Sequence, residues 1–272
     1  MKLFEKFKKK DNKVPFGQVE PKTLHKHLNF TAREQYKLLR TNIDFTLPQD
    51  EKCHVIGVTS SMRGEGKSTT AINLSYVLAE KGNKVIIIDG DLRIPSVAKK
   101  LQIASTPGLT TLLMNKSTEV EGFKSDMLDN WYILPAGEIP PNPSELLGSH
   151  RMEKLLDALK EEFDYIIIDL PPVNLVSDAL SISPFISGMV VVIREEYTEK
   201  KELTNCVRQL RLSNVNVLGC VLNEARANGG SYSKYKKYRY SKYYYKRGYY
   251  TYESEHKDAP EENSESQPTE GE

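Results

Sequence analysis

One glycine-rich run of the chain ends in a lysine and two hydroxyl residues. It reads Ser61-Met62-Arg63-Gly64-Glu65-Gly66-Lys67-Ser68-Thr69. The spacing is G-x-x-x-x-G-K-[ST], with Ser61 in place of the first glycine, and the run lies between an apolar segment and a helical pattern. In such a loop the backbone N–H groups point at phosphate oxygens, the lysine reaches the β- and γ-phosphates, and the first hydroxyl ligates Mg²⁺. The run therefore predicts a binding site for ATP and Mg²⁺.

Carboxylates end two other apolar runs. Three isoleucines lead into Asp89, with Asp91 and Arg93 close behind, and three more lead into Asp169, which precedes two prolines. Carboxylates beside a buried strand are costly unless they meet cations, which Mg²⁺ and a phosphate-bound lysine would supply. Asp169 has the form of a Walker B acid, which holds Mg²⁺ through water. A plainer alternative stays open, because strand-end aspartates also cap the helix or turn that follows.

A tyrosine-rich segment lies near the end of the chain, from Ser231 to Tyr252. It interleaves ten tyrosines with seven Lys or Arg residues, has no acid and no aliphatic residue, and gives way to an acidic stretch from Glu253. Such a segment cannot build a core and is typical of a flexible, low-complexity tail. Its tyrosines are Tyr232, Tyr235, Tyr238, Tyr240, Tyr243, Tyr244, Tyr245, Tyr249, Tyr250 and Tyr252.

These tyrosines are candidate acceptors for a phosphoryl group. A phenol has a pKa near 10, so a nearby base helps its oxygen to attack at neutral pH. We expect Asp89 to accept this proton and Asp91 with Asp169 to support Mg²⁺, although the order of the first two stays open. Arg93 either organises charge near the phosphates or forms a structural ion pair. Lys67 is expected to be an exposed cation when no nucleotide is bound.

Other uses of the tail compete with this interpretation. Interleaved aromatic and basic residues can bind nucleic acid by stacking and charge, and they can also contact an anionic membrane. A third alternative is a tail that only keeps the protein in solution. Beside a phosphate-binding loop we rank the acceptor role first, and we do not expect nucleic acid as a partner.

The elements that position these residues alternate along the chain. Several apolar runs are continuous rather than alternating, which is typical of strands buried on both faces. Strands that alternate with helices predict an α/β fold, a mostly parallel sheet with helices on both faces, and ligands at the carboxyl ends of its strands. The expected strands are 54–59, 84–89, 131–134, 165–169, 188–193 and 215–222, and the expected helices include 67–81, 151–162 and 199–212.

Three regions follow from this pattern. Residues 1–29 are expected to form a mostly irregular basic arm, 30–225 the P-loop domain, and 226–272 the flexible tyrosine cluster with its acidic end. The domain is expected to open with a helix over 31–47, in which Thr31 and Glu34 form a capping box.

The composition limits where the protein works. The net charge of +1 over 272 residues names no partner, and three cysteines at no metal-ligand spacing indicate buried free thiols in a reducing compartment. No apolar leader opens the chain, and its longest apolar stretch is too short to span a bilayer. We expect a cytosolic protein that meets a membrane through a partner.

Together these motifs resemble the bacterial tyrosine kinases, and most of all the Gram-positive cytosolic subunit encoded with capsule or exopolysaccharide genes. The resemblance runs from about Thr31 to Tyr252 and includes the motif D-x-D-x-R that begins at Asp89. It also includes Glu34, Lys37 and Arg40, which align with a family motif, E-x-x-R-x-x-R, that builds a ring-shaped oligomer. Lys37 departs from that motif, and lysine cannot reproduce the bidentate fork of arginine.

The resemblance implies a function and its partners. Such kinases transfer the γ-phosphate of ATP to tyrosines, chiefly in the C-terminal cluster of a neighbouring subunit. A separate membrane protein of the polysaccharide chain-length type stimulates them through its cytosolic tail and recruits them to the inner face of the membrane. A phosphotyrosine phosphatase resets the cluster, and the phosphorylation state regulates export of the polysaccharide.

A positioning or partitioning ATPase of the same superfamily is the main alternative. Such proteins share the strand-end aspartates but switch between monomer and dimer as they hydrolyse ATP. They usually carry an extra lysine early in the P-loop, where this chain has Met62 beside Arg63, and they lack a tyrosine tail.

Overall fold

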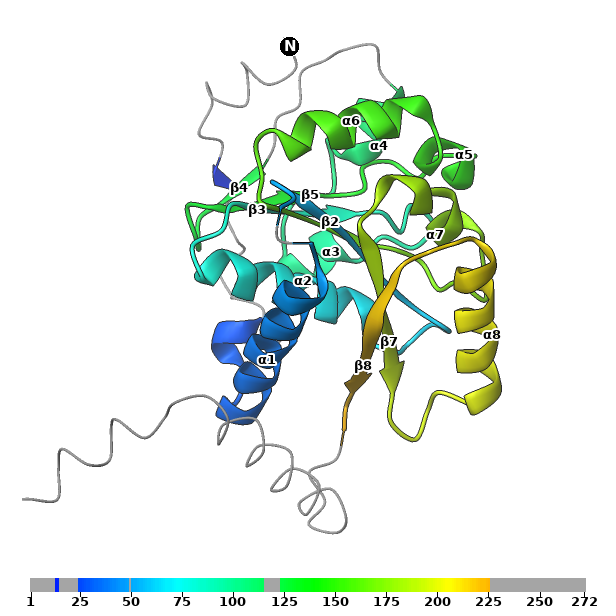
Figure 1. Cartoon of the computed structure of the whole chain (residues 1–272). Helices are drawn as coiled ribbons and strands as arrows, with labels where there is room; N and C mark the ends of the chain where they lie inside the picture. Colours follow the sequence, from blue (N-terminus) through cyan, green and yellow to red (C-terminus); the bar gives the residue numbers. More distant parts are fainter. Residues whose placement is uncertain (1–12, 15–23, 49, 115–122, 226–272) are drawn as a thin grey trace, which may run out of the picture. The chain divides into compact units, whose positions relative to one another are not determined.

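The computed structural model describes residues 13–14, 24–48, 50–114 and 123–225 (Figure 1). The chain separates into two units, Met1–Ala225 and Arg226–Glu272, and every described residue belongs to the first. The predicted tyrosine cluster and its acidic end lie outside the described residues, as does most of the basic arm.

The described residues form one eight-stranded sheet with the order β1-β4-β5-β3-β6-β2-β7-β8. Its six strands from β5 to β8 are parallel, and only β4 runs antiparallel to its neighbour β5. The isoleucine runs form β3 and β6 at its centre, where both faces are covered. The strands are β1 Lys13–Val14, β2 His54–Ser60, β3 Val85–Asp89, β4 Phe123–Ser125, β5 Trp131–Leu134, β6 Tyr165–Asp169, β7 Gly188–Arg194 and β8 Val217–Asn223.

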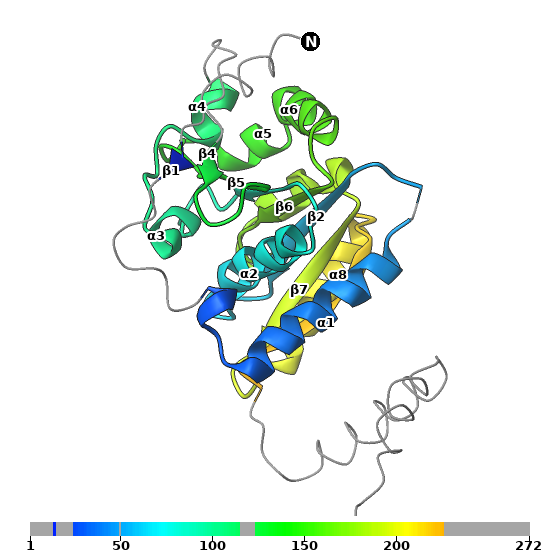
Figure 2. The same cartoon turned by 90° about the vertical axis from the view of Figure 1, so that its left-hand side faces the viewer.

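Helices cover both faces of the sheet, as predicted. Side chains of α1, α2 and α3 pack into one hydrophobic core and those of α4 to α8 into the other, so α1 and α2 lie in front of the sheet in Figure 2 and α8 behind it. The helices are α1 Phe30–Thr46, α2 Lys67–Glu80, α3 Val97–Leu101, α4 Leu109–Met114, α5 Pro143–Leu147, α6 His150–Lys160, α7 Asp178–Ser181 and α8 Lys200–Leu212, with 3-10 turns at His25–His27 and Ser183–Phe185. None of the described helices is long and apolar enough to cross a membrane.

Two local expectations were wrong. Helix α1 is capped by Asn29, whose Oδ1 accepts the Ala32 N–H at 2.9 Å, so Thr31 and Glu34 form no capping box. An asparagine carboxamide caps as well as a threonine hydroxyl, and here it comes two residues earlier. Among the cysteines, Cys53 and Cys206 are buried free thiols, but Cys220 is exposed because it lies on β8, the last strand in the sheet order.

Candidate active site

The glycine-rich loop joins the end of β2 to the start of α2. Gly66 precedes the helix with φ 93°, a left-handed conformation that favours glycine, and a Cβ there would come within 2.0 Å of Asn223 Nδ2. No side chain caps the N-terminus of α2. Its first N–H groups are therefore available to an anion, and the helix dipole adds positive potential at the same point.

Glu65 fixes the conformation of this loop through hydrogen bonds. Its carboxylate is fully buried and accepts hydrogen bonds from Ser61 Oγ at 2.7 Å, Met62 N at 2.8 Å and Thr198 Oγ1. Ser61, which replaces the usual first glycine, thus contributes to the framework of the loop. Of the predicted loop residues, Arg63, Gly64 and Gly66 to Thr69 line the cavity, whereas Ser61, Met62 and Glu65 do not.

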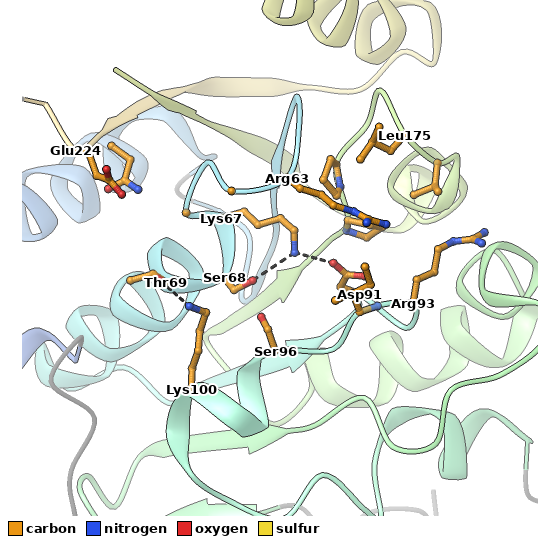
Figure 3. Close-up of a pocket in the computed structure, with 17 residues that line it drawn as sticks. Arg63, Lys67, Ser68, Thr69, Asp91, Arg93, Ser96, Lys100, Leu175 and Glu224 are labelled. Atoms are coloured by element: carbon orange, nitrogen blue, oxygen red, sulfur yellow. Dashed lines mark hydrogen bonds and ion pairs between the residues drawn. The ribbon is translucent and has the colours of Figure 1, made fainter. Parts of the chain in front are cut away.

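Lys67 lies between two carboxylates from neighbouring strand ends, and Figure 3 shows its pairing with one of them, Asp91. Its Nζ is 2.8 Å from Asp91 Oδ2 and 3.4 Å from Asp169 Oδ1, and its side chain is only 12% exposed. The expectation of an exposed cation was therefore wrong, because these two acids hold the ammonium. Burial alone would lower the pKa of Lys67, but Asp169 and Asp91 outweigh it and hold the pKa above its usual value.

Asp89 is placed differently from Asp91. Its carboxylate is fully buried, and Oδ2 accepts the N–H groups of Ser96 at 3.0 Å and Val97 at 2.9 Å at the start of α3. Burial and the nearby Asp169 raise the pKa of Asp89 to about 7. Asp89 does not line the cavity and Asp91 does, so the geometry favours Asp91 over Asp89 as the acid that meets a substrate.

Arg93 forms the structural ion pair that the sequence offered as one of its two roles. Its Nε donates to Asp178 Oδ2 at 2.8 Å and its second terminal nitrogen to Oδ1 at 3.0 Å, which makes a bidentate ion pair with a fully buried acid. Ser144 Oγ donates to the same carboxylate. Arg93 also lines the cavity, so its guanidinium is held in a fixed orientation at the edge of the site.

The cavity has a volume of about 520 Å³ and lies at the carboxyl ends of the parallel strands. Several of its residues were not predicted. Lys100 donates to Thr69 Oγ1 at 3.1 Å, and Asn223 donates to Glu65 O at 3.0 Å. No spacing signal marks them, because tertiary packing brings them to the loop. The unpredicted lining residues are Ile94, Ser96, Lys100, Pro171, Pro172, Leu175, Val176, Asn223 and Glu224.

The residues present fit Mg²⁺ bound together with a phosphate. Asp169 is fully buried and its Oδ2 has no hydrogen-bond partner, which is costly unless a cation meets it. Burial raises the pKa of Asp169 and Lys67 opposes this shift. Ser68 Oγ, 3.3 Å from Lys67 Nζ, and Asp91 supply further hard oxygens. Within the described residues no cluster of three His, Cys or acidic side chains could hold a metal, and Mg²⁺ usually takes its other ligands from phosphate and water.

The residues expected to build an oligomer lie on α1, away from this cavity. Glu34 accepts a hydrogen bond from Lys37 Nζ at 2.9 Å, which leaves both on the helix surface. Arg40 instead donates to the Val77 carbonyl of α2 at 2.7 Å. Part of the hydrogen-bonding capacity of Arg40 is thus used inside the fold.

Comparisons with known proteins identify the family of the chain. The family model described as AAA domain matches residues 53–219. Tyrosine-protein kinase YwqD of Bacillus subtilis (strain 168) is 37% identical over 222 residues, which cover 82% of this chain and 88% of that relative. Tyrosine-protein kinase CpsD of Streptococcus agalactiae is 32% identical over 208 residues, 76% of this chain and 90% of CpsD. The crystal structure of the chimerical protein CapA2B2 has a TM-score of 0.70 and 33% identity, and covers 78% of this chain and 95% of its own.

The positioning ATPases are more distant. The cell division ATPase MinD of Pyrococcus furiosus has a TM-score of 0.54 and 27% identity, over 65% of this chain and 74% of MinD. The shared fold explains that likeness, and the longer matches are to kinases. The chain therefore belongs to the bacterial tyrosine-protein kinases of the capsule type, and it is a protein-tyrosine kinase.

Proposed function

We propose that this kinase phosphorylates, in trans, the tyrosine cluster of a neighbouring copy of the chain. The phosphorylation state would then regulate synthesis and export of a capsular or extracellular polysaccharide. The observation that carries this proposal is the position of Lys67 at the N-terminus of α2, which no side chain caps. Its ammonium lies between the cavity-lining Asp91 and Asp169, whose second oxygen, Oδ2, has no hydrogen-bond partner. Such a site binds a nucleoside triphosphate with its γ-phosphate beside two acids.

The residues divide the work as follows. The backbone of residues 61–69 and Lys67 bind the phosphates of ATP, while Ser68 and Asp169 would hold Mg²⁺, which neutralises charge on the phosphates when bound. The phenol oxygen forms a bond to the γ-phosphorus as the bond to the β-bridging oxygen breaks, and ADP leaves. We assign Asp91 to receive the phenol proton, since Asp89 caps α3 and lies outside the cavity. Arg93 supplies positive charge at the edge of the site.

The partners belong to the same proposal. The cytosolic tail of a membrane adaptor of the polysaccharide chain-length type would activate the kinase and recruit it from the cytoplasm to the inner face of the membrane. A cognate phosphatase would reset the cluster, and Glu34, Lys37 and Arg40 would contribute to a ring-shaped oligomer. Activity that does not change when an adaptor tail is added would contradict the first part.

A mixing experiment tests transfer in trans. One full-length chain carries Lys67→Met and keeps all its tail tyrosines, and the other keeps Lys67 but has all ten tail tyrosines replaced by Phe. Neither can label itself, so phosphotyrosine in the Lys67→Met chain after addition of ATP and Mg²⁺ requires transfer between chains. We expect labelling in the mixture and none in either chain alone. An unlabelled mixture, with a labelled wild-type control, would show that transfer occurs within one chain.

A further inference from the structure

The cavity has two ends, one on each side of Lys67. In Figure 3 Glu224 lies at one end and Leu175 at the other, with Lys67 and Asp91 between them. Asp91 lies on the Leu175 side of Lys67, and the acids of such a site meet the γ-phosphate and its cation. The base of the nucleotide therefore belongs at the Glu224 end. This leaves the Leu175 end for whatever approaches the γ-phosphate.

That end is an exposed apolar wall. Leu175 there is 42% exposed, and Pro172 and Val176 of the same turn of chain also line the cavity. Ile94, which is 50% exposed and directly follows Arg93, lines it too. The main chain fixes their positions, because Leu175 N donates to Pro172 O at 3.2 Å and Ile94 N donates to Asp91 Oδ1 at 3.0 Å. Apolar side chains in a concave site beside a few charged groups are typical of a ligand pocket.

Arg93 borders the same wall. Asp178 holds one edge of its guanidinium through two hydrogen bonds, and this acid is fully buried on α7. A guanidinium held along one edge keeps its planar faces for stacking, and arginine stacks well on aromatic rings. The Leu175 end thus offers aliphatic carbon and a flat cation beside the acid Asp91.

We propose that Ile94, Pro172, Leu175 and Val176 form the subsite that holds the ring of the acceptor tyrosine. This inference rests on the proposed function, because it takes the acceptor tyrosine to come from the tail of a second copy of the chain. In this position the phenol oxygen attacks the γ-phosphorus, ADP leaves, and the phenol proton passes to Asp91. A serine side chain has no ring to pack against these apolar residues, so the subsite selects tyrosine over serine by apolar contact.

The test uses full-length Leu175→Ala and Ile94→Ala, with Leu212→Ala as a matched control. Leu212 is 74% exposed on α8 and does not line this cavity. Two synthetic peptides serve as acceptors, one with the sequence of residues 231–252 and one unrelated peptide with a single tyrosine. Each cavity variant should raise the KM for both peptides about tenfold, as a truncated contact in an apolar pocket does. The Kd for ADP should not change, and Leu212→Ala should match wild type in both measurements.

A further variant and a defined set of refuting outcomes make the test conclusive. Leu175→Met conserves the volume of the side chain and should keep a wild-type KM, which separates a lost contact from misfolding. An unchanged peptide KM in both alanine variants would overturn the subsite, as would a weaker ADP affinity with an unchanged peptide KM. If wild type phosphorylates the unrelated peptide but never its own tail, the proposed function fails, while the KM of Leu175→Ala for that peptide still decides the subsite.

Discussion

Replacing Lys67 by Met should destabilise the nucleotide-free protein as well as disable it. Lys67 Nζ is 2.8 Å from Asp91 and 3.4 Å from Asp169, whose side chains are 6% and 0% exposed. Methionine keeps most of the apolar stem and removes the charge. The variant therefore leaves two nearly buried carboxylates without their cation, which is costly in a poorly solvated site.

The size of the effect follows from burial. Breaking one side of a buried ion pair costs about 3–5 kcal/mol. Part of this is recovered, because the pKa of Asp169 is already raised by burial and its protonation removes the unpaired charge. We expect a loss of about 3 kcal/mol at pH 8, and this corresponds to a fall in Tm of about 6–12 °C for a domain of this size. The loss should be smaller at pH 5, where Asp169 is more easily protonated.

Thermal and urea unfolding without nucleotide would measure this loss at both pH values. Lys81→Met is the matched control, because Lys81 pairs with Asp44 at 2.7 Å but is 52% exposed, and such surface pairs contribute less than about 1 kcal/mol. Adding Asp169→Asn to Lys67→Met should restore much of the lost stability. The reasoning is refuted if Lys67→Met melts no lower than Lys81→Met at pH 8.

Three other predictions concern the P-loop, pH and the tail. Thr198→Val removes a hydrogen-bond donor to the buried Glu65 and should weaken ADP binding about three- to tenfold, as measured by titration. Thr204→Val, on the exposed face of α8, should leave the ADP affinity unchanged. Equal ADP affinities of the two variants would contradict this prediction. Because the pKa of Asp89 is raised to about 7, its contribution to stability is greatest below about pH 4 and is lost as the pH rises through 7. In urea unfolding, Asp89→Asn should reduce the fall in the free energy of unfolding between about pH 4 and pH 7. An unchanged dependence of this free energy on pH would contradict the raised pKa of Asp89. Seven Lys or Arg residues lie between Ser231 and Tyr252, and about four or five phosphates of −1.5 to −2 charge each would neutralise them. Oligomer size should therefore fall progressively as the number of phosphates per chain rises. A single Tyr→Phe substitution that blocks dissociation would contradict this gradual dependence on charge.

The strands and the loop motif could be predicted because their signals are local. Continuous isoleucine runs mark β3 and β6 to within a residue, and the glycine spacing marks the turn into α2. Asn29 was missed as the cap of α1 because several nearby residues could cap, and only packing selects one. The short strand β4 carries too few residues for a pattern.

The rest of the site depends on long-range contacts that no spacing encodes. The partner of Arg93 is Asp178, 85 residues away, and Asn223 reaches Glu65 across 158 residues. Asp89 and Asp91 look equivalent in sequence, and only the start of α3 separates them, since its N–H groups engage Asp89 and leave Asp91 at the cavity. The apolar wall at Leu175 follows a proline pair that predicted only a turn.

The most direct test of the central claim locates the phosphate itself. Full-length protein is incubated with labelled ATP and Mg²⁺, with and without an adaptor tail, and the product is mapped by mass spectrometry beside Lys67→Met. The account predicts phosphotyrosine within residues 231–252 of the wild type and none in the variant. Release of inorganic phosphate with no phosphotyrosine on the chain would contradict it and would indicate a switch ATPase.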